Sequence, residues 1–124
     1  MRSASDIVML VEKELLRFTD LAQREVARGL LVPPRWEQRE WDYGEAGQTL
    51  PCWIVAEHAE SNTAFAYCEQ GFGPERPWGL LFLSLSSPYP SMGMDCGWYG
   101  HFDECLRESW AWDTIEAENA GSET

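Results

Sequence analysis

Basic side chains are scarce in this chain. Its 124 residues include nine Lys and Arg against 21 Asp and Glu, which gives a formal net charge of -12. Binding to a phosphate backbone or to an anionic membrane surface depends on clustered Lys and Arg. The composition therefore predicts a protein that binds neither nucleic acid directly nor a membrane.

Close pairs of metal-type ligands are also lacking. There are only two histidines, and no two of the four cysteines have C-x-x-C spacing. Structural zinc sites and thioredoxin-type redox sites depend on such spacing. We therefore expect no metal and no cofactor, and we interpret the cysteines as small, partly buried thiols. These are Cys52, Cys68, Cys96 and Cys105.

Catalytic patterns are equally weak, so we expect a protein that is not an enzyme and has no catalytic residue. A thiol dyad of Cys68 or Cys96 with a histidine is disfavoured, because acidic surroundings raise a thiol pKa. With 21 acids in the chain, no carboxylate pair stands out for acid–base chemistry. One alternative stays open, a metal or ligand site formed by Asp95, Cys96 and His101.

Long hydrophobic runs are absent. The apolar run of residues 7–11 meets Glu12 at once and is too short for a signal peptide or a membrane span. We therefore expect a cytoplasmic protein. With 44% hydrophobic and 13% aromatic residues, the chain can bury a real core. We predict a single domain over residues 1–112 and a flexible acidic tail over residues 113–124.

The order of periodic segments predicts an α+β fold with an N-terminal helix, an antiparallel sheet of four or five strands, and a C-terminal helix. Apolar residues at steps of three and four predict the first helix, and Ser3 or Ser5 can cap it. Short runs between Gly- and Pro-rich turns predict the strands. The expected helices span residues 5–29 and 101–110, and the expected strands span residues 35–43, 48–57, 63–70, 78–85 and 98–99.

The hairpin of residues 48–70 has one small and one large face. A turn centred on Glu60 places Cys52 opposite Cys68. The same register places Ile54 opposite Ala66 and Ala56 opposite Ala64, whereas the aromatic residues lie on the other face. Because a small face permits close approach, we expect the N-terminal helix to pack there.

The negative charge is concentrated in one part of the chain. Residues 1–39 carry a net charge of +1, whereas residues 40–124 carry -13. A solvated, soluble surface is the plain interpretation of this charge. The sharper interpretation is attraction of a basic partner.

The charge and the aromatic content together predict a small acidic inhibitor or immunity-type protein that blocks a basic partner, such as a nucleic-acid-binding protein. Tyr and Trp are enriched among interface hot spots. The predicted partner-binding residues are Glu37, Glu40, Trp41, Asp42, Tyr43, Glu45, Trp53, Glu57, Glu60, Tyr67 and Glu69.

Two other classes of function remain open at this point. The first is a small enzyme or ligand-binding module with a pocket under the loop of residues 86–100, which would hold Asp95, Cys96 and His101 within hydrogen-bond reach of one another. The second is a structural protein that self-associates, for example as a homodimer, through the aromatic face of the sheet.

Overall fold

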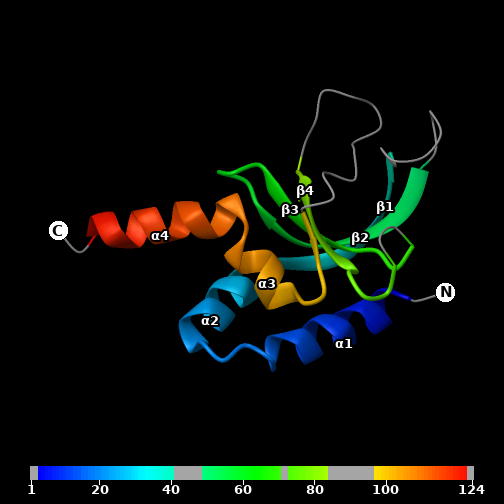
Figure 1. The fold of residues 1–124 in the computed structure, drawn as a ribbon, viewed down its shortest axis with the longest axis horizontal. Coiled ribbons are helices and arrows are strands. Elements are labelled where there is room, and N and C mark those ends of the chain that lie inside the picture. Colours follow the sequence, from blue (N-terminus) through cyan, green and yellow to red (C-terminus); the bar gives the residue numbers. More distant parts are fainter. Residues whose placement is uncertain (1–2, 41–48, 71–72, 84–96, 123–124) are drawn as a thin grey trace.

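The computed structural model describes residues 3–40, 49–70, 73–83 and 97–122 (Figure 1). The chain begins with helices, continues through an antiparallel sheet and ends with helices, as the α+β prediction requires. The five strands follow one another in chain order. They are β1 (Leu31–Glu40), β2 (Thr49–His58), β3 (Thr63–Tyr67), β4 (Trp78–Phe82) and β5 (Trp98–Tyr99).

The N-terminal segment forms two helices, α1 (Ala4–Leu15) and α2 (Leu21–Leu30), so the prediction of one long helix is wrong. Asp20 causes the break, because its carboxylate accepts hydrogen bonds from the first backbone N–H groups of α2. Arg24 of α2 donates to the Leu15 and Phe18 carbonyl oxygens at the end of α1. Ser3 caps α1 in a capping box with Asp6.

The predicted hairpin is confirmed, with a change of register in its middle. Trp53 lies opposite Tyr67 and Ile54 opposite Ala66, as a turn centred on Glu60 requires. Beyond Ile54 the register shifts at a β-bulge, so Ala56 pairs with Phe65 and not with Ala64. The bulge places both Val55 and Ala56 in the core beneath the helices.

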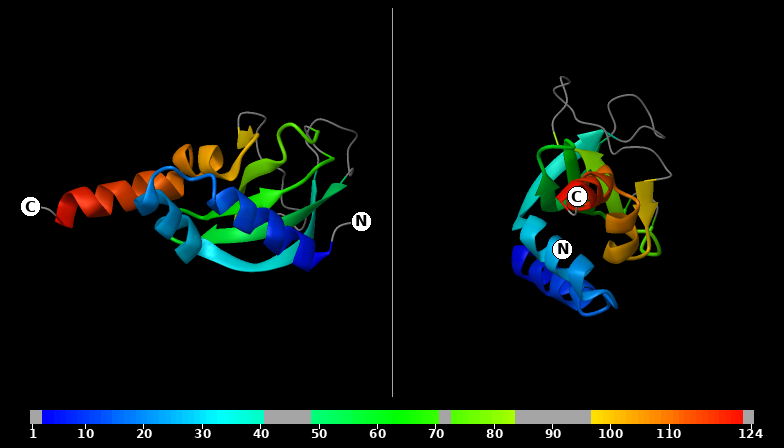
Figure 2. Two further views of the ribbon diagram at one scale, coloured as in Figure 1. Left: turned by 90° about the horizontal axis from the view of Figure 1, so that it is seen from below. Right: turned by 90° about the vertical axis from the view of Figure 1, so that its left-hand side faces the viewer.

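The helices cover the large, aromatic face of the sheet, so the prediction that the N-terminal helix packs on the small face is wrong. Ile7, Val11 and Leu15 of α1 are buried in one core cluster with Phe65 and other large residues of the sheet. Figure 2 shows α1 and α2 side by side beneath the strands. Large side chains fill the space that a helix leaves over a twisted sheet.

The small face forms a second core cluster, to which no helix of the described residues contributes. Cys52, Ile54, Ala64, Ala66 and Cys68 lie in it, as predicted for these five residues. The cluster also contains Leu81 and Trp98, and the half-buried Val32, Leu50 and Leu83 pack against it.

A buried arginine spans the edge of this second core. Arg39 of β1 is 1% exposed and donates to the Phe82 carbonyl oxygen at the end of β4, 3.1 Å away. Its guanidinium also pairs with Glu37 at 2.9 Å. Because β2 and β3 lie between β1 and β4, this contact shows that the sheet curls strongly toward its small face.

The C-terminal part forms α3 (Phe102–Arg107) and α4 (Trp110–Ser122). Phe102 and Leu106 of α3 are buried, whereas Trp110, the first residue of α4, is 61% exposed. The structure places residues 113–122 in α4, which extends away from the sheet (Figure 2); the predicted mobility of residues 113–124 stays a prediction. None of the helices formed by the described residues is long and apolar enough to cross a membrane.

Candidate ligand-binding groove

An aromatic row crosses the whole sheet on its helix-covered face. Each member is the register partner of the next, so one residue from each of the five strands contributes to the row. The order across the sheet is Trp36, Trp53, Tyr67, Trp78 and Tyr99. Side chains directly opposed on one face contact each other, and the aromatic row is therefore a continuous packed structure.

The helices cover one end of the aromatic row and leave the other end open. Trp78 is buried and packs against Phe102 of α3, with ring centroids 5.4 Å apart. Trp36, on the edge strand β1, is 41% exposed. The open end of the row therefore lies at the sheet edge, where a ligand can reach it.

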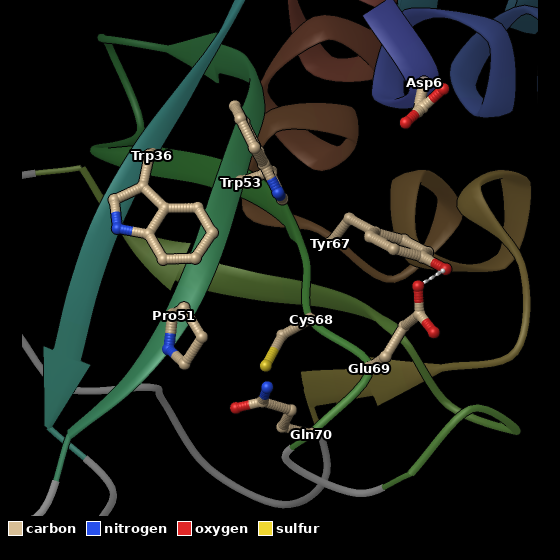
Figure 3. Close-up of a pocket in the computed structure, with 8 residues that line it drawn as sticks. All are labelled: Asp6, Trp36, Pro51, Trp53, Tyr67, Cys68, Glu69 and Gln70. Carbon is tan, nitrogen blue, oxygen red and sulfur yellow. Dashed lines mark hydrogen bonds between the residues drawn. The ribbon is translucent and has the colours of Figure 1, made fainter. Parts of the chain in front are cut away.

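A groove of about 720 Å³ is located at this open end (Figure 3). Such a volume lies within the range of small-ligand sites. The sheet supplies its aromatic wall, the first turn of α1 supplies Asp6, and the segment after β3 supplies polar groups. We call it the edge groove; its lining residues are Asp6, Trp36, Pro51, Trp53, Tyr67, Cys68, Glu69 and Gln70.

Two of the aromatic side chains meet at a right angle in the edge groove. The indole rings of Trp36 and Trp53 have centroids 5.4 Å apart and an interplanar angle of 81°. The ring of Tyr67 is mostly buried and packs against Trp78 at 4.9 Å. The two indoles therefore form a corner, and the tyrosine ring is held in place beside it.

A carboxylate is held next to the tyrosine. The Tyr67 hydroxyl donates a hydrogen bond of 2.8 Å to Glu69 Oε1, as Figure 3 shows. Asp6, in the first turn of α1, accepts a hydrogen bond from the Ser3 backbone N–H at 2.9 Å. The described lining of the groove thus contains two carboxylates and no Lys or Arg.

The edge groove brings together three of the predicted partner-binding residues, Trp53, Tyr67 and Glu69. The prediction did not include its other lining residues, Asp6, Trp36, Pro51, Cys68 and Gln70. A signal for Trp36 was present in the sequence, because pairing the predicted strands around the turn of residues 44–47 places Trp36 near Trp53. No such signal pointed to Asp6, because the N-terminal helix that carries it was expected on the small face of the sheet.

Two predicted acids lie on the opposite face of the sheet and are paired. Glu37 Oε2 lies 2.6 Å from Arg35 Nε, and Glu57 Oε2 lies 3.3 Å from Arg35 Nη2. The hydrogen bond to Glu37, with that to Glu57, raises the pKa of the Arg35 guanidinium. Because Arg39 also pairs with Glu37, these acids are largely neutralised and add little to the field at the edge groove.

The remaining predicted residues are not gathered at the groove by the described structure. Glu60 is exposed in the turn between β2 and β3. Glu40 belongs to β1, but its side chain is outside the description. The other four predicted residues lie outside the described residues and stay predictions: Trp41, Asp42, Tyr43 and Glu45.

Of the three residues of the alternative site, Asp95, Cys96 and His101, the structure describes only His101. Its ring nitrogen Nδ1 lies 3.2 Å from Glu14 Oε1, and the same oxygen accepts a hydrogen bond from the Phe102 backbone N–H at 2.9 Å. Glu14 of α1 thereby caps the start of α3. Asp95 and Cys96 lie outside the described residues, within which no group of three or more metal-type ligands occurs.

The three cysteines in the described structure are free and buried. Cys52 and Cys68 share a hydrogen bond that together with burial raises the pKa of the Cys52 thiol. Burial likewise raises the pKa of Cys105 well above its ordinary value. A high thiol pKa disfavours the thiolate that nucleophilic chemistry needs.

Comparison of the chain with protein-family models, with curated proteins and with solved structures finds no match.

Proposed function

We propose that this chain is a small acidic binding protein of the inhibitor or immunity type, and that it blocks a basic protein partner through the edge groove. One observation carries the proposal. An aromatic corner at an open sheet edge lines one groove together with two carboxylates, in a chain whose net charge is -12.

The exposed part of the aromatic row supplies the contact area for such a partner. Hot spots of protein interfaces are enriched in Trp and Tyr that fill pockets near the centre of the contact. Trp36 and Trp53 present their rings at the groove, and the packed row behind them keeps them in place. A preorganised side chain loses little conformational entropy on binding.

The negative net charge of the molecule favours a partner with a positive net charge. Like charges repel an acidic partner, whereas a basic partner is attracted before contact and associates faster. This attraction is long-ranged and is screened by salt. Affinity for the partner should therefore fall as the ionic strength rises.

Self-association through the aromatic sheet face has less surface available to it. Helices α1, α2 and α3 contribute to the core cluster on that face, which leaves the edge groove as its open part. A basic partner is favoured over a second copy of this chain, because two copies would each carry a charge of -12.

The test is capture of a partner from the source cell by immobilised protein, with three baits compared side by side. The wild-type chain and the control Trp110→Ala should retain the same basic protein, and Trp36→Ala should lose it. Trp36 is 41% exposed and lines the groove, whereas Trp110 is 61% exposed and does not line it.

The affinity of the captured protein is then measured while sodium chloride rises from about 0.05 to about 0.5 M, and it should weaken steadily. Three results would overturn the proposal: an acidic partner, an affinity that does not depend on salt, or equal retention by Trp36→Ala.

A further inference from the structure

The corner formed by the two indoles restricts the shape of a ligand. With an interplanar angle of 81° and a centroid distance of 5.4 Å, Trp36 and Trp53 cannot both stack on one broad flat ring. A sugar ring or a nucleobase would therefore use only one of the two indoles. A compact group can lie on the face of one indole and direct its edge to the other.

The electrostatics of the corner favour a cation. The face of an aromatic ring carries the negative part of its quadrupole and attracts ammonium and guanidinium groups within about 6 Å. The Tyr67 hydroxyl donates to Glu69, which places a carboxylate beside the aromatic wall. Asp6 offsets the positive end of α1, because it accepts a hydrogen bond from the Ser3 N–H in the capping box.

Guanidinium fits this corner better than a lysine ammonium does. It is planar, it is only weakly hydrated, and it stacks on aromatic faces while its N–H groups point outward in the plane. Those N–H groups can donate to a carboxylate oxygen in a paired arrangement. In the edge groove, the carboxylate of Glu69 and the indole faces lie on the same cavity.

We infer that the edge groove binds one arginine side chain of the basic partner, with its guanidinium in the corner of Trp36 and Trp53. This inference rests on the proposed function for the identity of the occupant. The recognition itself needs only the groove, so it is measurable without the partner.

The experiment is an NMR titration of the full chain with Nα-acetyl-arginine amide. Its comparison ligand is Nα-acetyl-citrulline amide, which has nearly the same shape but carries a neutral urea in place of the guanidinium. The arginine compound should shift the indole N–H signals of Trp36 and Trp53, and the citrulline compound should bind about tenfold more weakly or not at all.

Variants separate the groove from the rest of the surface. Trp36→Ala should weaken binding of the arginine compound by about fivefold or more. Glu69→Gln removes a negative charge from the same groove and should weaken binding less. The control Trp110→Ala removes an exposed indole outside the groove and should leave the affinity unchanged. Unchanged backbone spectra away from the groove would show that each variant is folded.

Three outcomes would overturn the inference: equal binding of the citrulline compound, tighter binding of a neutral disaccharide such as cellobiose, or full affinity in Trp36→Ala. The inference and the proposed function can fail separately. Capture of a basic partner without arginine binding would overturn only the inference. Arginine binding without a basic partner would overturn only the proposed function.

Discussion

Trp98 lies across Gly79, its register partner on the neighbouring strand. A Cβ atom added at Gly79 would stand 2.5 Å from Trp98 Cε2 and Cε3, a separation that real contacts do not show. The indole therefore occupies the space that any other residue at position 79 would need. It closes the small-residue core of the sheet at its β5 side.

Replacement of Gly79 should consequently destabilise the fold. We expect Gly79→Ala to lower the free energy of unfolding by about 1–3 kcal/mol, because the buried indole must move out of a packed position. Gly29→Ala is the matched control, since nothing lies within 4 Å of a Cβ there. That change, near the end of α2, should be neutral or stabilise by up to about 1 kcal/mol. Urea denaturation of the two variants provides the measurement, and equal stability would contradict the steric account.

Truncation of Arg39 should be among the most damaging single changes. Arg39→Ala leaves the Phe82 carbonyl oxygen without its donor and opens a cavity at a side chain that is 1% exposed. We expect a loss of about 3–5 kcal/mol in the free energy of unfolding. Arg39→Lys should recover only part of it, because an ammonium cannot reach two acceptors in the fixed geometry of a guanidinium. Full recovery with lysine would show that charge alone is needed.

Glu14 should act as a helix cap at long range. Its Oε1 accepts from the Phe102 N–H, 88 positions along the chain, at 2.9 Å. Glu14→Ala should cost about 0.5–2 kcal/mol, the usual value of a lost cap. Glu14→Gln keeps an acceptor oxygen and should cost less. Thermal unfolding followed by circular dichroism can rank the two variants, and the reverse order would reject the capping role.

The buried thiols predict a loss of stability at alkaline pH. The shared hydrogen bond with Cys68 raises the folded-state pKa of Cys52, and burial raises that of Cys105. In the unfolded chain a thiol ionises near pH 8.5, so above that pH the unfolded state holds fewer protons than the folded state. The free energy of unfolding should then fall by about 1.4 kcal/mol per pH unit for each such thiol.

The variant Cys105→Ala isolates one of these thiols. Its stability should decline with pH less steeply than that of the wild-type protein between about pH 8.5 and about pH 9.5, by the slope of a single thiol. Urea denaturation at several pH values measures both slopes. If the slopes were equal, Cys105 would not remain protonated in the folded state.

The sequence predicted the class of fold well, because alternation and turn residues are local signals. The register of Trp53 with Tyr67 followed from the turn at Glu60 alone. The break before α2 was missed, since Asp20 fits equally well on a polar helix face and as a cap. The bulge after Ile54 was also missed, because it depends on packing against helices from distant parts of the chain.

The candidate site was predictable only in part, for a related reason. Composition indicated that aromatic and acidic residues would meet, and Trp53, Tyr67 and Glu69 do line one groove. Composition did not indicate which acids would be neutralised. Glu37 and Glu57 are both paired with Arg35, Glu37 from the same strand and Glu57 from the neighbouring strand β2.

The sequential order of the strands has a kinetic consequence. Each strand pairs with its immediate neighbours in the chain, so the sheet can assemble by pairing of successive strands, and the connection between β2 and β3 is the shortest. Local contacts of this kind favour fast folding. The contact between Glu14 and Phe102 instead joins residues 88 positions apart. Closing so long a loop costs conformational entropy, and this cost falls once the residues between them have formed the sheet. The edge groove needs α1 as well as the sheet, so a ligand there would bind only after this late docking step.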